Sequence, residues 1–564
     1  MWVIGELGVL YAGAVNVPLS IKLGEANDLV FRVKHSDSKY VITSKFQLPK
    51  IRTILPECPM VEKVILFDQV DDMQENEIYI GEIMEMGDKF LAENEEQFIQ
   101  RYKSIGPDDY ANISYTSGTT ADPKGILLTH RNYTANVEQA HSVIGVESTD
   151  RMLIILPLDH CFAHVAGFYT MMSYGASIGT VPSGKSGKEA LRNISPSIME
   201  LQPNVMLSVP TLAKNFKKSI ETAIKKKGAT VEKLYNFALN NAIAYYKEGY
   251  NKGTQFVDIF RWPLVKLFDK LVFSSVRQGL GGKMKFFVGG GALLDIDLQK
   301  YYNAIGIPMY QGYGLSEATP IISANSPQRH IFGSSGKVVT PMEIKILDAD
   351  GVEQPYGVKG EICIKGENVM AGYWKNPKST ADTVVDGWLH TGDMGYMRDA
   401  EMLYVVGRFK SLLIAADGEK YSPEGIEENL VESSKYIDGA ILHNSQDPYT
   451  IVLITPNKDA LKAYAKDLGL DPTSEEAKVK MLELLQDEVN MYRKGGRLFG
   501  AFPERWLPAA VCVLPEPWTE QNHFLNSSMK VVRGRVEEAY KENMEYAYTP
   551  EGKNIVNKMN LASL

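Results

Sequence analysis

Short apolar runs alternate with amphipathic segments through the first three hundred residues. The runs most typical of buried strands are KYVITS (39–44), VEKVILF (61–67), NISYT (112–116), RMLIILP (151–157), NVMLSVP (204–210) and MKFFVGG (284–290). Segments of helical periodicity lie between them, for example 132–145 and 293–306. Such alternation predicts a layered α/β architecture with largely parallel sheets.

This pattern changes twice further along the chain. Residues 212–280 form a long, Lys-rich helical stretch, and alternating strand patterns such as EIKIL (343–347) and GEICIKG (360–366) then indicate a β-rich subdomain. After GRFK (407–410) mixed strands and helices begin again. We therefore predict a large N-terminal domain over 1–408 and a small, mobile α+β domain over 409–564.

Composition narrows the class of protein. A chain of 564 residues exceeds what one core accommodates, and a net charge of -9 gives no support for a nucleic-acid partner. Four cysteines without a CxxC pair fit a reducing, cytoplasmic setting. The apolar segment 1–20 carries Glu6 and lacks a basic start, so we expect a buried helix running into a strand rather than a signal peptide.

The segment YTSGTTADPKG (115–125) carries the clearest candidate chemistry. Its Lys-Gly order is the reverse of a Walker A loop, yet its hydroxyls, backbone N–H groups and lysine suit phosphate oxygens, with a flexible surface turn as the alternative. The candidate phosphate-binding residues are Thr116, Ser117, Gly118, Thr119, Thr120 and Lys124.

The whole string resembles the signature loop of the acyl-adenylating (AMP-binding) superfamily. Ala121 departs from that pattern, because the family usually has glycine there. Further resemblances follow in the family's order, namely GGGALL (289–294), YQGYGLSE (310–317), GWLHTGD (387–393), GRFK (407–410) and LNSSMKVVRGRV (525–536). Their order implies acyl adenylation far more strongly than any one of them does.

The central motifs imply how ATP and Mg²⁺ are held. Gly291 and Ala292 would wall the adenine, and Tyr313, followed by Gly314, would stack on it. The resemblance further implies two residues at the phosphates: Ser316 would offer its hydroxyl to the α-phosphate, and Glu317, with Thr120, would ligate Mg²⁺. A core tyrosine and a first-turn helical acid are the plain structural alternatives.

The later motifs imply ribose binding and catalysis. Asp393 and Arg408 would contact the ribose hydroxyls, with an ordinary turn or salt bridge as the alternative. Lys410 would mark the hinge before the small domain. Lys530 would be the catalytic cation, with a solvated lysine as its alternative.

Two strings resemble the long-chain fatty acyl-CoA synthetase branch, 269–294 and LPLDHCFAHV (156–165). The resemblance implies a fatty acid, ATP and coenzyme A as substrates and puts His160 near the acyl and pantetheine entry, where a structural histidine is an equal alternative. The basic helices KNFKK and IKKKG allow a peripheral contact with an anionic membrane, although a solvated helix face is favoured. Family members usually have an opening segment before the stretch that begins here at Trp2, which favours a truncation or an upstream start codon.

Three alternatives stay open. The first is an acyl-AMP ligase that loads a carrier protein. The second is a catalytically impaired acyl or nucleotide binder, suggested by Ala121 and the missing opening segment. The third is a P-loop NTPase, suggested by GTVPSGKS (179–186) with Lys185, but that single match leaves the other motifs unexplained.

Overall fold

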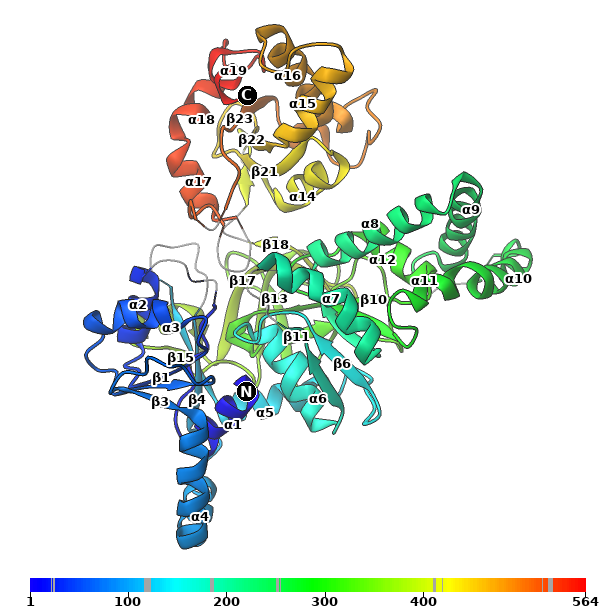
Figure 1. The fold of residues 1–564 in the computed structure, drawn as a ribbon. Helices are drawn as coiled ribbons and strands as arrows, with labels where there is room; N and C mark the ends of the chain where they lie inside the picture. Colours follow the sequence, from blue (N-terminus) through cyan, green and yellow to red (C-terminus); the bar gives the residue numbers. More distant parts are fainter. Residues whose placement is uncertain are drawn as a thin grey trace. The chain divides into compact units, whose positions relative to one another are not determined.

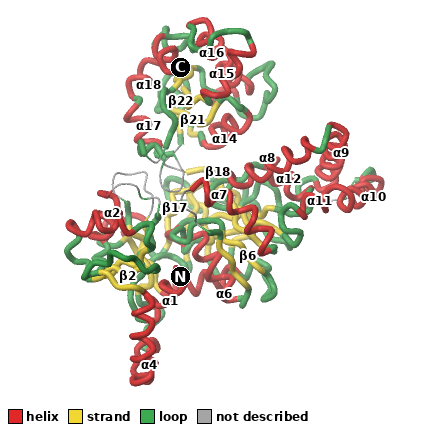
Figure 2. Tube along the Cα trace, viewed as in Figure 1, coloured by secondary structure: helices red, strands yellow, loops and turns green. Residues whose placement is uncertain are grey.

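The computed structural model describes residues 1–564 except 22, 24–25, 116–122, 183–186, 250–252, 254, 409–411, 418, 520 and 526–530. The chain forms two compact units, a larger one built from residues up to Val405 and a smaller one built chiefly from Val406–Leu564 (Figure 1). Both mix helices with strands, so the predicted α/β class is confirmed (Figure 2). The roles predicted for the two domains stay predictions.

A twelve-stranded sheet organises the larger unit. One half is parallel, in the order β10-β9-β8-β6-β7. Its strands are β6 (Arg151–Ile154), β7 (Ser177–Thr180), β8 (Val205–Ser208), β9 (Phe286–Gly289) and β10 (Met309–Gly314). The apolar runs predicted at 151–157, 204–210 and 284–290 all fall on these strands.

Both faces of this parallel half are buried, which explains its continuous apolar runs. Met152 and Ile154 face the main core, whereas Leu153 between them faces a second core. The same alternation places Met206 and Phe287 in the second core. Helices supply the remaining cover: α5 (His130–Ala140), the π-helical η2 (Phe162–Tyr169), α6 (Thr170–Ser173), α7 (Gly187–Leu201), α8 (Pro210–Lys226), α9 (Ala229–Tyr246), α10 (Asp258–Phe268), the π-helical η3 (Asp269–Phe273), α11 (Ser274–Gln278) and α12 (Ile296–Ala304).

The other half of the sheet comes from the region predicted as a β-rich subdomain, whereas the parallel pairing expected for the first three hundred residues is confirmed in the first half. After β10 the chain folds back and pairs antiparallel, so the β-rich region continues the same sheet. The free edge of β10 carries unpaired backbone N–H and C=O groups, and the next strand, β11, forms hydrogen bonds with them. This half comprises β11 (Ile321–Ala324), β12 (Gly336–Val338), β13 (Glu343–Leu347), β14 (Gly360–Lys365), β16 (Val384–Val385), β17 (Trp388–Met397) and β18 (Met402–Arg408), with α13 (Pro377–Thr383) before β16.

The N-terminal third adds two small sheets, β1-β2-β3 and β15-β5-β4. Its elements are α1 (Trp2–Tyr11), α2 (Ala26–His35), β1 (Tyr40–Thr43), α3 (Leu48–Ile54), β2 (Lys63–Leu66), β3 (Glu77–Tyr79), α4 (Ile80–Lys103), β4 (Tyr110–Tyr115) and β5 (Gly125–Thr129), joined by the later β15 (Gly372–Tyr373). In the described part of the chain, no helix combines the length and the apolarity that a bilayer crossing requires.

The opening segment differs from the prediction in two respects. α1 is a helix, but Gly5 and Glu6 are its only buried residues, and the expected strand is a single bridge between Asn16 and Asn112. Glu6 is buried because His164 and Tyr169 bind its Oε1, at 3.0 and 2.8 Å. Because Glu6 has these polar partners, α1 buries its carboxylate in the interior and does not bury an apolar stripe.

The smaller unit is α+β, with a core around the sheet β21-β22-β23. Its elements are β19 (Leu413–Ile414), β20 (Lys420–Tyr421), α14 (Glu424–Ser433), β21 (Ile437–His443), β22 (Ile451–Pro456), α15 (Lys458–Asp467), α16 (Glu475–Val489), β23 (Ala510–Val513), α17 (Arg533–Ala539), α18 (Lys541–Ala547) and α19 (Lys558–Ser563). Short 3₁₀ turns across the chain are Leu55–Glu57 (η1), Ser316–Ala318 (η4), Asn490–Tyr492 (η6) and Glu504–Trp506 (η7).

Candidate active site

The two segments predicted to surround adenine leave neighbouring parallel strands. GGGALL follows β9 and GYGLSE ends β10, with Gln311 paired to Gly289. The buried Gln311 side chain ties them together, because its Oε1 accepts from Leu294 N at 2.9 Å and its Nε2 donates to Ala292 O at 3.2 Å. The carboxyl ends of parallel strands are where α/β proteins bind nucleotides. Sequence reasoning missed Gln311, since a lone glutamine in a strand carries no signal.

Two glycines of these motifs have specific structural reasons. Gly291 has φ +83°, a backbone region that side chains with a Cβ rarely adopt. A Cβ on Gly314 would lie 1.9 Å from the carbonyl oxygen of Pro320, so the chain can fold back after β10 only with glycine there. The roles predicted for Gly291, Ala292 and Gly314 toward adenine stay predictions.

Tyr313, Ser316 and Glu317 follow one another across an irregular strand end. The pairing of β10 with β11 shifts register between Tyr313 and Gly314, and Ser316 and Glu317 lie in the 3₁₀ turn η4. All three predicted site residues are half-buried. The bulge turns the chain out of the ladder and presents their side chains at the end of the strand.

Tyr373 orients the carboxylate of Glu317, and sequence reasoning missed it. Its hydroxyl donates to Glu317 Oε1 at 2.9 Å. Burial, with the nearby Glu317 charge, holds the pKa of Tyr373 well above its ordinary value, so the phenol stays a donor. The string GYW around Tyr373 is as typical of a strand end as of a functional site. Only the fold shows that Tyr373 contacts Glu317.

Lys124 joins the same group. Its Nζ lies 4.6 Å from the centroid of the Tyr373 ring, because β15 pairs antiparallel with β5 next to Lys124. Thr129 caps α5, the next helix after the loop. The loop residues themselves, Thr116, Ser117, Gly118, Thr119, Thr120 and Ala121, lie outside the described part of the chain.

The loop after β6 brings His160 and Cys161 to the same strand ends. The Cys161 thiol is buried, and its Sγ donates to Ser114 Oγ at 3.5 Å. Burial raises the pKa of Cys161, and this effect outweighs the lowering by hydrogen bonds with Ser114 and Ser316. The thiol therefore stays protonated and neutral beside the Ser316 hydroxyl. His160 is exposed, and its Nδ1 accepts from the backbone N of Phe162 at 3.2 Å. Its predicted place at an acyl entry stays a prediction.

Asp393 and Arg408 contact each other. Arg408 Nε lies 3.3 Å from Asp393 Oδ1, with side-chain exposures of 56% and 9%, respectively. Burial raises the pKa of the neighbouring Glu424, with Glu427 adding to the effect. The fold thus brings the two predicted ribose residues together, an arrangement that serves a ribose or a plain salt bridge equally.

A buried ion pair anchors the start of α17 in the smaller unit. Both Nη2 contacts of Arg533 to Glu427 are short, 2.6 and 2.7 Å, and Leu442 N also donates to Glu427. Burial raises the pKa of Glu427, and Arg533 opposes that shift. Arg533 comes three positions after Lys530 in the sequence. Lys530 and the predicted hinge Lys410 lie outside the described residues.

Comparison with known proteins decides the family. A family model described as "AMP-binding enzyme" matches residues 1–374 of the 564. The chain belongs to the AMP-binding enzyme family.

Two named relatives illustrate the range within the family. This AMP-binding enzyme is 30% identical over 569 residues to long-chain-fatty-acid--CoA ligase 5 of Mus musculus, covering 97% of the chain and 78% of the relative. It is 25% identical over 593 residues to the long-chain-fatty-acid--[acyl-carrier-protein] ligase AEE15, chloroplastic, of Arabidopsis thaliana, with the same coverage of both. Acyl-adenylating ligation is the activity class that these relatives support.

The solved structures agree on the fold. The crystal structure of the anthranilate CoA ligase AuaEII in complex with anthranoyl-AMP aligns with a TM-score of 0.66 at 19% identity, over 96% of this chain and 86% of that one. The Walker A match has no support from these comparisons. Its first two residues end strand β7, and Lys185 lies outside the described residues.

One further cluster of metal-type donors occurs among the described residues of the enzyme. The donor atoms of Glu361, Cys363 and His390 lie within 4.8 Å of one another. His390 Nδ1 is 2.9 Å from Glu361 Oε2, and burial raises the pKa of Cys363 to about 12. A thiol that stays protonated is a poor ligand, so the trio is a hydrogen-bonded support between β14 and β17.

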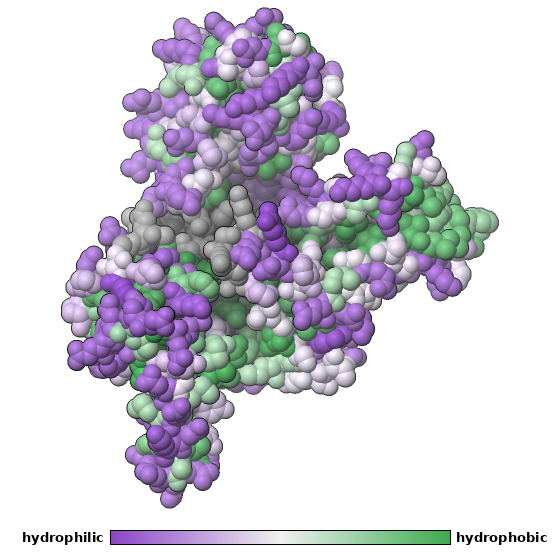
Figure 3. Space-filling view, in the orientation of Figure 1, coloured by the Kyte–Doolittle hydropathy of each residue, from purple (hydrophilic) through white to green (hydrophobic). Residues whose placement is uncertain are grey.

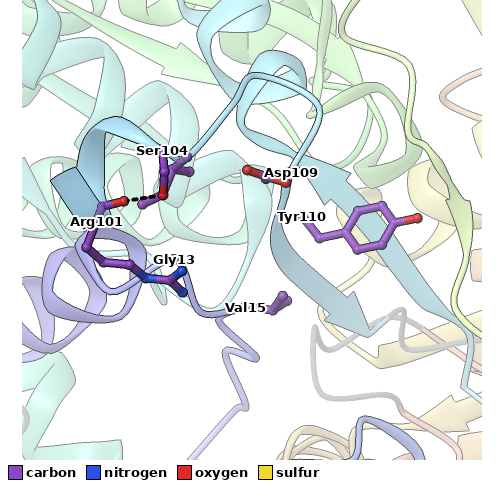
Figure 4. Close-up of a pocket in the computed structure, with 7 residues that line it drawn as sticks. Gly13, Val15, Arg101, Ser104, Asp109 and Tyr110 are labelled. Atoms are coloured by element: carbon purple, nitrogen blue, oxygen red, sulfur yellow. Dashed lines mark hydrogen bonds between the residues drawn. The ribbon is translucent and has the colours of Figure 1, made fainter.

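A separate cavity of about 290 Å³ lies between the end of α1, α4 and β4 (Figure 4). Arg101 borders it but already donates to the carbonyl oxygen of Ala12 at 3.0 and 3.1 Å. No residue of the adenylation motifs lines this cavity. Arg101 thereby joins α4 to the end of α1, which is a structural task.

Proposed function

We propose that this enzyme joins a long-chain fatty acid to coenzyme A in two half-reactions. In the first, the carboxylate oxygen attacks the α-phosphorus of ATP, and pyrophosphate leaves. In the second, the CoA sulfur attacks the acyl carbonyl, AMP leaves, and the thiol proton passes to solvent. Adenylation turns a poor acyl donor into a good one.

One observation carries the proposal: the motifs that end β9 and β10 converge, with the Glu317 carboxylate held by Tyr373 and Tyr373 in turn covered by Lys124. An aromatic face, hydroxyls, a carboxylate and a cation at one sheet edge suit a nucleotide triphosphate. Long-chain acyl transfer to CoA is supported by the relative from Mus musculus, which carries that activity in its name.

Each residue takes the role that its motif implies. The loop 116–120 with Lys124 would grip the phosphates, and Tyr313, Gly314, Gly291 and Ala292 would hold the adenine. Ser316 would bind the α-phosphate, and Asp393 with Arg408 the ribose. Lys530 would stabilise the charge that develops during adenylation, and the small domain would then turn about Lys410 for thioester formation. His160 would border the acyl and pantetheine entry.

The donor set at Glu317 also suits Mg²⁺. A carboxylate with one oxygen already held by a phenol, together with the Thr120 hydroxyl, offers the oxygen ligands that this hard cation prefers. When bound, the ion supplies charge neutralisation of the ATP phosphates.

The deciding experiment incubates the enzyme with ATP, Mg²⁺, palmitate and CoA. We expect palmitoyl-CoA, AMP and pyrophosphate. Acyl-adenylate without palmitoyl-CoA would favour transfer to a carrier protein, the alternative supported by the relative from Arabidopsis thaliana. ATP binding without fatty-acid-dependent pyrophosphate release would favour an impaired binder. Lys530→Ala should abolish adenylation and Lys185→Ala should spare it, and the reverse result would restore the P-loop hypothesis.

A further inference from the structure

Exposed apolar side chains concentrate on one part of the larger unit. Among the residues that the structure describes, 34 large hydrophobic side chains are exposed, and 11 of them fall between Val231 and Leu271, a segment of 41 residues. Figure 3 shows a continuous apolar area over the helical insert that carries α9 and α10. Apolar surface gathered in this way marks an interaction site, whereas scattered exposed residues need no explanation.

The outward stripe of α10 and η3 is apolar at helical spacing. Phe256, Phe260, Leu264, Leu267 and Leu271 recur every three or four residues, and Phe256 and Phe260 are 80% and 66% exposed. The inward stripe, with Val265, Phe268 and Val272, is apolar as well and packs in the second core. A helix with two apolar stripes, of which only one is packed, presents the other stripe outward. We call this outward stripe the α10 face.

Basic residues outnumber acids in the part of the sequence that contains the α10 face. Residues 225–277 contain ten lysines and arginines and four acids, in a chain whose net charge is -9. Three of the acids are already paired with these basic groups: Glu232 with Lys225, Asp258 with Lys247 and Arg261, and Asp269 with Arg277. Lys266 lies with its Nζ 4.5 Å from the centroid of the exposed Trp262 ring. Lysine beside tryptophan at the border of an apolar face is the arrangement that a membrane interface favours.

The protruding helix α4 provides an internal contrast. It also exposes large apolar residues, among them Phe90 and Leu91, at 46% and 41%. Over residues 80–103, however, six acids stand against three basic residues. Charge therefore separates the two exposed apolar helices, since only the α10 face would be attracted to an anionic surface.

We propose that the α10 face docks on the headgroup region of an anionic lipid bilayer. The apolar stripe would enter the interface, with Lys266 and Lys270 at the level of the phosphates. A second copy of the chain fits less well, because two faces with this excess of positive charge would repel each other. The inference moves the basic contact first considered for KNFKK and IKKKG to the neighbouring helices. It extends the proposed function by bringing the enzyme to a store of fatty acid, but its test needs no catalysis.

The test measures co-sedimentation of the whole enzyme, without substrates, with vesicles of phosphatidylcholine mixed with phosphatidylglycerol or of phosphatidylcholine alone. We expect binding to the mixed vesicles that salt weakens. The variant Phe260→Ser/Trp262→Ser should lose about tenfold or more in affinity, because two interfacial aromatic anchors are removed. Lys266→Glu/Lys270→Glu should lose binding to the mixed vesicles selectively. The matched control Phe90→Ser/Leu91→Ser should bind like the unmodified enzyme.

Equal binding by Phe260→Ser/Trp262→Ser and the unmodified enzyme would overturn the proposal, as would no binding to mixed vesicles. A dimer that this double variant dissociates, with no vesicle binding, would assign the face to a second copy instead. All three outcomes can be measured whether or not the ligase is active. Pyrophosphate release with a water-soluble short-chain acid should be unchanged in the α10 variants, which confirms that they fold. If the enzyme shows no ligase activity, circular dichroism provides the folding control.

Discussion

At the scale of single residues, the decisive contacts are hydrogen bonds that place a charged group. Tyr373→Phe removes the donor to Glu317 Oε1 but keeps the ring beneath Lys124. A hydrogen bond to a charged group contributes about 1.5–3 kcal/mol, so we expect kcat/KM for ATP in adenylation to fall roughly 10- to 100-fold. The measurement is the rate of fatty-acid-dependent pyrophosphate release at varied ATP concentration.

The control for this variant is Tyr396→Phe, which removes a hydroxyl from another half-buried tyrosine that stacks on Tyr404. We expect unchanged kinetics there. If Tyr373→Phe also leaves kcat/KM unchanged, Glu317 needs no orientation by the phenol and the site proposed at η4 loses its support.

At the scale of elements, the ion pair between Glu427 of α14 and Arg533 of α17 fixes how α17 begins. Arg533→Met leaves a buried carboxylate without its main partner, and breaking such a pair typically costs about 3–5 kcal/mol. We expect that loss in the unfolding of the smaller unit, measured by hydrogen exchange in β21 and β22. Because α17 follows Lys530, adenylation should decline with it.

The double variant Glu427→Gln/Arg533→Met serves as the matched control, since it removes both charges together. It should recover much of the stability, because no unpaired charge is left inside. A cost below about 1 kcal/mol for Arg533→Met alone would contradict a role for this pair in anchoring α17.

At the scale of the whole molecule, stability depends on keeping buried groups neutral. His330 is 8% exposed between the rings of Tyr310 and Phe332, and burial lowers its pKa from 6.5 to about 4. The unfolded chain therefore binds more protons between these values, so stability present above pH 6.5 is lost as the pH falls toward 4.

His330→Leu should remove this acid sensitivity. Lowering the pH from 7.5 to 5 should destabilise the unmodified protein by roughly 2 kcal/mol more than the variant. Urea unfolding of the larger unit at both pH values measures the difference. Equal losses would show that His330 is protonated without penalty in the folded state.

Much of the architecture was predictable because most strands coincide with short apolar runs or apolar–polar alternations that are visible in the sequence. EIKIL (343–347) is β13 to the residue, and five of the six apolar runs of the first three hundred residues contain their strands entirely. The exception, at 112–116, overlaps β4. The change from parallel to antiparallel pairing at β10 was not predictable, because it depends on which backbone edge is free when the sheet assembles.

The sequence by itself determined the family, through short strings in a fixed order, because glycines, hydroxyls and charges at set spacings reflect local backbone and ligand chemistry. Only the tertiary structure decided which side chains serve those strings. Gln311 of β10 ties its own segment to the one that follows β9, and Tyr373 of β15 holds Glu317 of η4. No local pattern in the sequence records that these elements meet. The same reason applies to α10, whose apolar positions fit a core or a surface until packing covers one stripe and leaves the other exposed.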